Sequence, residues 1–480
     1  MTTFVGRFSE LRKLSQALEE VRGGHGSTGR CAFVSGSRAV GKTRLIGEFT
    51  QRARAVSLWY AADDRAVDGM HGATVSSRTP EGAAVASFVD HASVSELPQA
   101  SRFRDILVPD WDTALRLLAD ALGDGEPSIV VFDNASTLIE SDRSFAPAFR
   151  RAWQRSLREK PVLLIVVGRD LTPLTDADGG DAVLVPVQPF NPAELGTVLA
   201  LDPLGALDAH IVTGGHADIA AQWPTGAGTL DALSAMLGRS PSVFEIRGEL
   251  YLARQLGLST QPESVLAATG SAQRSRASIG RIAALPPASL DRSLKSLVAD
   301  GLMVVDRPLS LHVSREARYR LADSYLRFWL QTIAPRREDI ARGRMGLVIT
   351  DMRAHWDTWR RQAMSVLAQE AMNRLATAGQ LPGTRAVGSY WNRFEDVRID
   401  LVGTDKADNP GAVTFVGGLK WDATSSFDPF DLASLISVRK QVPGVTESTP
   451  LVAVSLGGST VGDAVAAVLG PNELIAAWQA

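Results

Sequence analysis

Short apolar runs alternate with segments of helical hydrophobic spacing over the first 190 residues. Each run holds four to six residues, which is typical of strands buried in a parallel sheet. The runs are residues 31–34, 57–61, 129–132, 162–167 and 182–187. Residues 42–52 and 111–122 carry apolar side chains at helical spacing and predict amphipathic helices. This alternation predicts an α/β fold, a parallel sheet covered by helices on both faces.

The segment from residue 62 to residue 101 breaks the alternation. It is polar, contains many glycines and alanines, and shows no firm period. We therefore expect an irregular insertion or a mobile loop there.

The bulk composition is that of an ordinary globular protein. Of 480 residues, 45% are hydrophobic and 21% charged, and this length predicts about three or four domains. The net charge of −3 neither favours nor excludes nucleic acid, because regions of opposite charge can cancel. One cysteine, Cys31, excludes an intramolecular disulfide framework. No signal peptide and no run of about 18 apolar residues is visible, so we expect a soluble, cytoplasmic protein without membrane contact.

A glycine-rich segment follows the first apolar run, where a strand should turn into a helix. It fits the pattern G-x-x-x-x-G-K-[ST], and we expect the following residues to contact a nucleotide: Gly36, Ser37, Arg38, Ala39, Val40, Gly41, Lys42, Thr43 and Arg44. The two glycines allow a turn that aims N–H groups at a polyphosphate, which also faces the positive helix N-terminus. Lys42 would reach the β- and γ-phosphates, and the Thr43 hydroxyl would bind Mg²⁺. The alternative is a glycine-rich turn without a ligand.

Two later strands end in polar residues that suit work on phosphate. Asp133 follows the run 129–132, and its carboxylate would hold Mg²⁺ through water. ATPases with a phosphate loop usually carry a glutamate next, but an amide such as that of Asn134 cannot accept a proton from the attacking water. Arg169 follows the run 162–167 and suits a γ-phosphate sensor because its charge is permanent. The alternative for Arg169 is a surface ion pair with Asp170 or another acid.

Residues 256–345 combine short helical segments with two short strands, which suggests a winged helix. Leucines at helical spacing form the buried stripe of its last helix, 289–297. From residue 271 to residue 345 there are 14 Lys and Arg against seven acids, which favours contact with phosphate. The candidate DNA contacts are Arg292, Lys295, Arg315 and Arg318. A solvated basic surface, or a winged helix that binds protein, is the alternative.

Three segments resemble the archaeal-type AAA+/STAND ATPases that carry a winged helix and a C-terminal nuclease-like domain. They are Phe4-Val5-Gly6-Arg7, Thr213-Gly214-Gly215-His216 and residues 318–329. In that family the second segment usually continues with proline, whereas this chain has Ala217. The resemblance implies ATP as the nucleotide, with adenine against Val5, Gly6 and Arg7. It also implies four domains: a nucleotide-binding core (1–190), a helical lid (191–255), a winged helix (256–345) and a nuclease-like domain (346–480).

The same resemblance implies a metal-dependent nuclease site in the last domain. Such a site needs an Asp on one strand, Glu-x-Lys on the next and a Glu on a helix. Glu370, Asp400 and Lys420 fit these positions, but Gly418 replaces the remaining acid. Arg398 also stands where the family commonly has an acid, so Mg²⁺ binding should be strongly weakened. We expect an inactive nuclease-like domain in which Asp400 and Lys420 are remnants that form an ion pair.

Three functions are compatible with these patterns. The first is a regulatory switch with slow or impaired hydrolysis, in which ATP or ADP sets the angle between core, lid and winged helix. The second is an active ATP-dependent nuclease that acts on foreign or mobile DNA. The third is a scaffold whose winged helix docks a protein partner. Oligomers are compatible with each of them. Asn134 and Gly418 argue against the nuclease.

Overall fold

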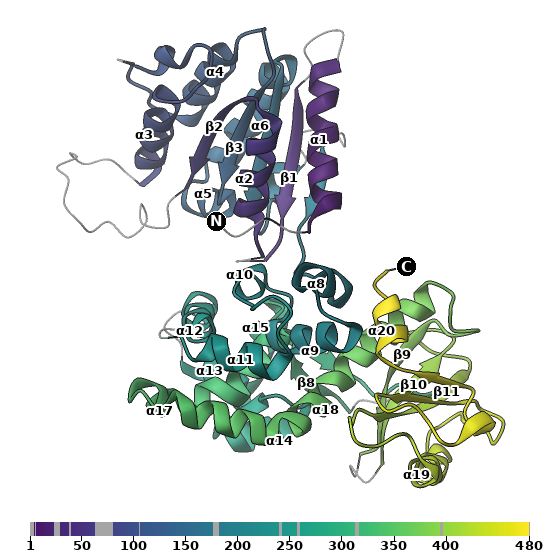
Figure 1. Cartoon of the computed structure of the whole chain (residues 1–480). Coiled ribbons are helices and arrows are strands. Elements are labelled where there is room, and N and C mark those ends of the chain that lie inside the picture. The colour runs from purple at the N-terminus through teal and green to yellow at the C-terminus, as the bar shows by residue number, and fades with distance from the viewer. Residues whose placement is uncertain are drawn as a thin grey trace. The chain divides into compact units, whose positions relative to one another are not determined.

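The computed structural model divides the chain into two compact units, Met1–Pro189 (unit 1) and Phe190–Ala480 (unit 2) (Figure 1). The structure describes residues 4, 6–23, 29–37, 40–62, 80–104, 106–175, 182–239, 242–256, 260–312, 316–393 and 397–479. The division between the units lies one residue from the predicted end of the nucleotide-binding core. The three segments predicted beyond it, 191–255, 256–345 and 346–480, share one hydrophobic cluster inside unit 2.

Unit 1 is built on a five-stranded parallel sheet, as the apolar runs predict. Its strands pair in the order β2-β3-β4-β1-β5. They are β1 (Arg30–Ser35), β2 (Val56–Ala61), β3 (Ser128–Asp133), β4 (Val162–Gly168) and β5 (Val183–Pro186). Side chains alternate between two buried clusters: Phe33 and Val130 belong to one, and Val34 and Ile129 to the other. The α/β class is therefore confirmed, with apolar cover on both faces.

Helices of unit 1 cover both faces of this sheet (Figure 1). One face packs against α1 (Phe8–Gly23) and α2 (Lys42–Ala53). The other packs against α3 (Pro80–Ser93), α4 (Trp111–Leu122), α5 (Ala135–Ser141) and α6 (Phe145–Arg155). The described residues of unit 1 also form three short elements: η2 (Ala100–Phe103), η3 (Leu157–Glu159) and α7 (Thr172–Thr175).

The prediction of an irregular segment over residues 62–101 is wrong for α3. This helix buries Val85, Phe88 and Ala92, which recur at three- and four-residue spacing. The Phe88 ring stacks on Phe132 of β3, with ring centroids 5.5 Å apart. In the sequence, these three positions are the main sign of a helical period in a segment rich in alanine, glycine and serine. The surface on which they pack is formed only when the sheet has folded. Residues 63–79 lie outside the described part of the chain.

Unit 2 begins with five helices, in the segment predicted as a lid. They are α8 (Pro192–Leu199), α9 (Pro203–Thr213), α10 (Ala217–Ala220), α11 (Thr229–Leu237) and α12 (Val243–Leu256). Asn191 caps α8 in a reciprocal capping box with Glu194, and Pro192 stands at the first helical position, as the sequence predicts. Among the described residues no single helix is long and apolar enough to span a membrane. Together, α8 and α9 are long and apolar enough for a membrane span by length and composition, but the two helices meet at an angle of 108°.

Three helices and a small antiparallel sheet follow. The order along the chain is α13 (Thr260–Thr269), β6 (Arg274–Ser275), α14 (Arg276–Ala283), α15 (Pro287–Ala299), β7 (Met303–Asp306) and β8 (Arg318–Leu321). The strands pair in the order β6-β8-β7. After β8 come α16 (Ser324–Phe328), η5 (Trp329–Ile333), η6 (Ala334–Arg336) and α17 (Arg337–Ala341).

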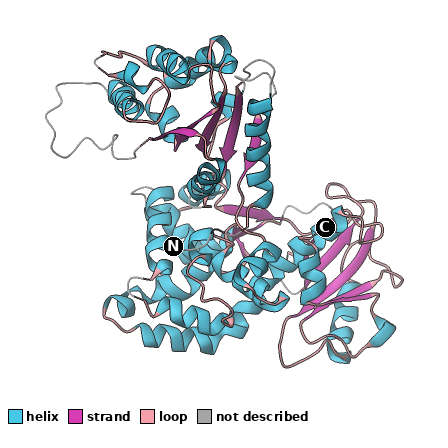
Figure 2. Ribbon diagram, turned by 45° about the horizontal axis from the view of Figure 1, so that its top comes forward, coloured by secondary structure: helices cyan, strands magenta, loops and turns pink. Residues whose placement is uncertain are grey.

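The C-terminal part of unit 2 is a mixed five-stranded sheet between helices (Figure 2). Its strands run in the order β13-β12-β11-β10-β9, antiparallel from β9 to β11 and parallel from β11 to β13. They are β9 (Ala386–Trp391), β10 (Arg398–Thr404), β11 (Val413–Lys420), β12 (Leu451–Ser455) and β13 (Ala467–Leu469). The helices are α18 (Met345–Thr377), α19 (Pro429–Arg439) and α20 (Pro471–Ala476), with the short η7 (Gly462–Ala464).

The helices α18 and α19 cover different faces of this sheet. Leu401 and Phe415 pack in the cluster that contains Leu367 of α18. Val402 and Val416, their chain neighbours, pack in the cluster that contains Leu435 of α19. Because successive side chains of a strand point to opposite faces, a residue of β10 or β11 contacts one helix or the other.

Two buried side-chain pairs connect distant segments of unit 2, an Arg–Asp ion pair and a His–Asp hydrogen bond. Arg360 of α18 donates to Asp208 of α9 at 2.7 Å, and His216 lies 2.8 Å from Asp323, which follows β8. Burial raises the pKa of Asp208 to about 6, although Arg360 opposes the shift. For Asp323 burial also opposes ionisation, but His216 prevails and holds the pKa below its usual value. Removing Asp208 would leave the Arg360 guanidinium as an uncompensated buried charge.

A buried histidine near the second pair makes the stability of unit 2 depend on pH. Burial lowers the pKa of His210 on α9 to about 4. Glu370, His216, Asp323 and Arg327 also act on it, and only the two acids oppose the shift. Its Nδ1 is buried, with no hydrogen-bond partner among the described residues. The ring is therefore neutral in the folded protein at neutral pH.

We expect His210→Leu to lose less stability on acidification than the parent. In the unfolded chain a histidine titrates near pH 6.5, so the contribution of neutral His210 is complete above that pH. Between about pH 6.5 and about pH 4 it is lost at about 1.4 kcal/mol per pH unit. Urea unfolding of both proteins at several pH values in this window measures the difference, in which the opposite contribution of Asp208 cancels. Parallel pH curves would contradict the assignment.

Candidate nucleotide-binding site

The glycine-rich segment joins the carboxyl end of β1 to the start of α2. At Gly36 φ is +156°, and a Cβ built there would lie 2.2 Å from the carbonyl oxygen of Val187. The Val187 N–H donates to the Ser35 carbonyl at 2.7 Å, which holds the two segments together. Gly41, with φ of 96°, directly precedes α2. Both motif glycines are therefore required by the backbone, and Arg38 and Ala39 lie outside the described residues.

The side chain of Lys42 folds back into this loop. Its Nζ donates to the carbonyl oxygens of Gly36 and Ser37, both at 2.7 Å. The loop thus carries a positive charge against its own backbone, where the motif predicts the phosphates. Phosphate oxygens are stronger acceptors than carbonyl oxygens, because they carry negative charge.

The first turn of α2 presents polar groups to the same place. The N-cap residue, Gly41, has no side chain that could cap the helix, and the helix N-terminus with its positive dipole end follows directly on the loop. Leu45, Ile46 and Phe49 bury one side of the helix and fix it on the sheet, while Thr43 and Arg44 are exposed. A hydroxyl at this position is an oxygen ligand of the kind that Mg²⁺ prefers.

The N-terminal segment is tied directly to the phosphate loop. Gly6 and Arg7 both have positive φ, 81° and 61°, so the chain bends sharply before α1. The buried Arg7 guanidinium donates to the Val40 carbonyl at 3.3 Å and to Glu10 at 3.2 Å. Gly6 and Arg7 therefore lie beside the loop, and their contact with adenine stays a prediction. Val5 lies outside the described residues.

The predicted acid and its neighbour lie at the carboxyl end of β3. Asp133 is buried, and its Oδ1 accepts the Asn134 N–H at 2.8 Å. Asn134 has a left-handed backbone, φ 57° and ψ 34°, which asparagine tolerates better than most residues. Its side-chain amide donates to the Ala62 carbonyl at 3.0 Å, beyond the end of β2. In the sheet, β4 separates β3 from β1, and the carboxyl ends of all three strands share one edge.

Arg169 follows β4 on this edge, but its guanidinium pairs with an acid. Nη2 lies 3.6 Å from Glu140 of α5, and both side chains are largely exposed. Its backbone N–H donates to Ser136 Oγ at 2.7 Å, which fixes the strand end. The pair is a weak surface contact, which a phosphate oxygen could replace. The sensor role of Arg169 stays a prediction.

The residues predicted for DNA contact fall into two groups. Arg292 and Lys295 are exposed on α15, while Leu290, Leu294 and Leu297 are buried on its other side, as the spacing predicts. Arg318 differs, because it is buried and its guanidinium stacks over Trp391 of β9 at 4.9 Å. The expectation that Arg318 faces DNA is therefore corrected: it packs inside unit 2. Arg315 lies outside the described residues.

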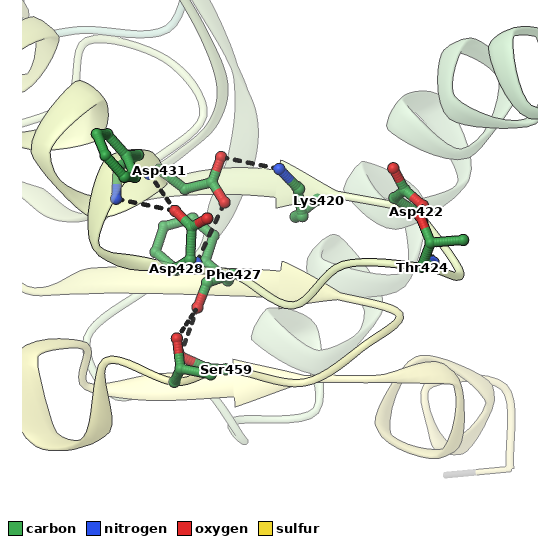
Figure 3. A network of polar contacts seen from close by, with 9 residues as sticks. Lys420, Asp422, Thr424, Phe427, Asp428, Asp431 and Ser459 are labelled. Atoms are coloured by element: carbon green, nitrogen blue, oxygen red, sulfur yellow. Dashed lines mark hydrogen bonds and ion pairs between the residues drawn. The ribbon is translucent and has the colours of Figure 1, made fainter.

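The four residues predicted for a degenerate nuclease site do not converge. Lys420 pairs with Asp431 of α19 at 3.2 Å, within the network that caps this helix (Figure 3). Gly418 faces the same side, since a Cβ there would touch Phe427 at 3.2 Å. Asp400 instead lines a cavity with residues of α18, and Glu370 is bound to Arg374.

The expected ion pair between Asp400 and Lys420 is therefore wrong, and a strand irregularity explains the error. The register between β9 and β10 shifts between Ile399 and Val402, which turns Asp400 toward α18. Burial raises the pKa of Asp400, against the pull of Arg398 at 3.9 Å. No group of three or more His, Cys, Asp or Glu that could hold a metal occurs in the described part of the chain.

Sequence reasoning missed one charged residue with functional potential. Arg327 lies in the segment 318–329, where the aromatic residues suggest packing alone. It is only 2% exposed, and its Nε and Nη1 have no partner among the described residues. An arginine between apolar neighbours, Leu326 and Phe328, is the signal in the sequence, since a cation rarely enters a core unpaired.

Comparison with known proteins assigns the first unit. Residues 3–166 match the family model described as an AAA ATPase domain. Unit 1 contains an AAA-type, ATP-binding domain. A second family model, described as archaea bacterial proteins of unknown function, matches residues 329–428. No curated protein matches the chain.

Several solved structures are similar to this chain. The Walker-type ATPase PABY2304 of Pyrococcus abyssi is 18% identical, with a TM-score of 0.44. The match covers 68% of this chain and 96% of the P. abyssi chain. The ORC1 protein of Aeropyrum pernix in complex with DNA is 18% identical, with coverages of 71% and 95% and a TM-score of 0.34. Cdc6p from Pyrobaculum aerophilum is 13% identical, with coverages of 73% and 97% and a TM-score of 0.32.

Two glycine variants test the loop geometry. In Gly36→Ala the new Cβ collides with the Val187 carbonyl, so the loop must move. We expect ATP affinity to fall tenfold or more, which is about 1.4 kcal/mol or more. Gly47→Ala is the matched control in α2, where a Cβ meets nothing within 4 Å. Calorimetric titration with ATP and Mg²⁺ should give it the parent affinity, with α2 stabilised by up to about 1 kcal/mol. Equal affinity of both variants would contradict the account.

Proposed function

We propose that the chain is an ATP-binding regulatory switch with slow or impaired hydrolysis. The observation that carries the proposal is Asn134. Lys42 suits the phosphates, Thr43 and Asp133 suit Mg²⁺, and the segment at Arg7 suits the adenine base. The attacking water has only an amide at the usual position of the general base, and an amide cannot take its proton.

The surroundings of Asn134 support an amide rather than a carboxylate. The Ala62 carbonyl accepts from the side-chain NH₂ at 3.0 Å, and a carboxylate has no donor to offer it. The left-handed backbone would cost a longer residue about 1 kcal/mol or more. The Asp133 carboxylate and Thr43 hydroxyl supply oxygen ligands for Mg²⁺, whose role when bound is to neutralise charge on the phosphates.

We further propose that the switch associates with DNA through a winged helix formed by residues 260–321. The order of three helices and three antiparallel strands supports this, with α15 as the recognition helix. Arg292 and Lys295 are exposed on α15, and Arg276 beside it pairs with Asp291 at 2.5 Å. A protein-docking scaffold remains the competing function, and salt dependence of binding distinguishes the two.

The active-nuclease alternative has less support. A nuclease of the expected kind needs its carboxylates and lysine on one face around a divalent metal. Here Lys420 is bound to Asp431 on the side of α19, while Asp400 lies beside Arg398 on the side of α18. The cation beside Asp400 also opposes metal binding.

The first test compares ATP turnover of three proteins. We expect the parent to turn over far more slowly than about 1 s⁻¹ and Asn134→Glu to be at least tenfold faster, because a carboxylate accepts the proton. Asn134→Gln is the matched control: it has the length of glutamate and the same backbone strain, but no basic oxygen. A gain in both variants, or turnover of the parent at about 1 s⁻¹ or more, would contradict the slow switch.

The second test measures binding to duplex DNA over a range of salt concentrations. The double variant Arg292→Ala/Lys295→Ala should bind more weakly, with a slope of log affinity against log salt reduced by about 2. Lys440→Ala is the control, since this exposed lysine ends α19 and pairs with Glu447. DNA affinity that is absent in the parent, or identical in all three proteins, would favour the protein-docking function.

A further inference from the structure

Two cavities lie inside unit 2, between the three-stranded sheet, α18 and the C-terminal sheet. The larger has a volume of about 590 Å³ and the smaller about 280 Å³. Both are lined by Arg320, Arg327 and Val366, so they adjoin one another. Neither contains a residue that the nucleotide-binding site or the proposed DNA contact uses.

The smaller cavity is strongly cationic. Four arginines line it against one acid, Asp400. Each comes from a different element of the unit: Arg320 from β8, Arg327 from α16, Arg361 from α18 and Arg398 from β10. Neutral hydrogen-bonding side chains complete the wall: Ser271, Gln273, Gln362 and Ser365. Arg398 stands where the nuclease-like pattern has an acid, so this place favours an anion over a metal ion.

Arg327 is the innermost of these cations. It is 2% exposed, and only its Nη2 has a partner, the Ser324 hydroxyl at 2.8 Å. Nε and Nη1 have none among the described residues. Burial and the neighbouring Arg320 lower its pKa to about 10, although Asp323, Asp306 and Glu370 oppose the shift, so it still carries its charge at neutral pH. A buried cation that no carboxylate contacts directly is destabilising, and a bound anion would offset this cost.

The four cations are graded from the mouth of the cavity to its interior. Arg361 and Arg398 are exposed, and the Arg398 side chain is 47% accessible. The Arg320 side chain is 19% accessible, and its Nε forms an ion pair with Asp306 Oδ2 at 2.8 Å. Arg327 lies deepest. An anion can therefore be attracted at the surface and desolvated inside.

We propose that this cavity binds a small phosphate-bearing molecule. Guanidinium groups form paired hydrogen bonds with phosphate oxygens. Two positive charges remain in excess once Asp400 and the Asp306 partner of Arg320 are counted, which matches a dianion better than a single carboxylate. The depth of Arg327 favours a small ligand, because the backbone of a DNA duplex is too wide to follow it inside. A bound phosphate would bridge the three-stranded sheet and the C-terminal sheet within unit 2.

The proposal is tested with pyrophosphate as the probe and the full chain carrying Lys42→Ala, which weakens the phosphate loop. We expect calorimetry to detect binding to this protein. Affinity should fall at least tenfold when Arg361→Ala/Arg398→Ala is added. Both side chains are exposed and belong to no buried hydrophobic cluster, so we expect the double variant to fold. Arg353→Ala is the control, because this exposed α18 arginine pairs with Asp231 outside the cavity. Its affinity should equal that of Lys42→Ala alone.

A third variant, Arg327→Met, tests the interior. Methionine fills similar space without charge, so we expect it to be as stable as the parent and to lose the rise in melting temperature that pyrophosphate gives. Absence of binding to Lys42→Ala, or equal affinity of the double variant and Arg353→Ala, overturns the proposal. Displacement of pyrophosphate by duplex DNA would also overturn it, because the arginines would then serve the DNA backbone.

Discussion

The carbonyl oxygen of Val187 approaches residue 36 so closely that only a glycine can stand there. This contact exists because β5 pairs with β1 as far as Ser35, and the residue after β5, Val187, donates its N–H to the Ser35 carbonyl. With the chain fixed at that point, the turn that follows brings Lys42 back onto the carbonyl oxygens of Gly36 and Ser37. Packing of the sheet thus positions the phosphate loop, and α2 starts where the loop ends.

Residues at the same end of the sheet support our proposal of binding without fast hydrolysis. Lys42, Thr43 and Asp133 offer the charge and oxygen ligands that a nucleotide with Mg²⁺ requires. Asn134 offers no base, and its left-handed backbone and its bond to Ala62 hold an amide in place. We therefore propose that the nucleotide acts as a regulatory ligand that is hydrolysed slowly or not at all. In unit 2, buried charges such as Arg360 with Asp208 connect segments far apart in sequence, so an anion in the arginine-lined cavity would act on the same framework.

The sequence predicted what local chemistry determines. Buried strands such as β3 and β4 are continuous apolar runs, and the Asn191 cap and both motif glycines have local causes. Contacts set by tertiary structure were not predictable. The partner of Lys420 depends on a register shift in a neighbouring strand, and the burial of Arg318 depends on Trp391, 73 positions away. The helix α3 shows the same limit, since three apolar residues indicate a period only beside Phe132.

Hydrogen exchange at the phosphate loop tests the central claim most directly. If the backbone N–H groups at the start of α2 hold phosphate, addition of ATP and Mg²⁺ should slow exchange of the amides of residues 41–45 in the parent. The amides of α4 report on unit 1 away from the loop and should be unaffected. Unchanged exchange at residues 41–45 at saturating ATP, in a protein whose α4 stays protected, would contradict nucleotide binding at this loop.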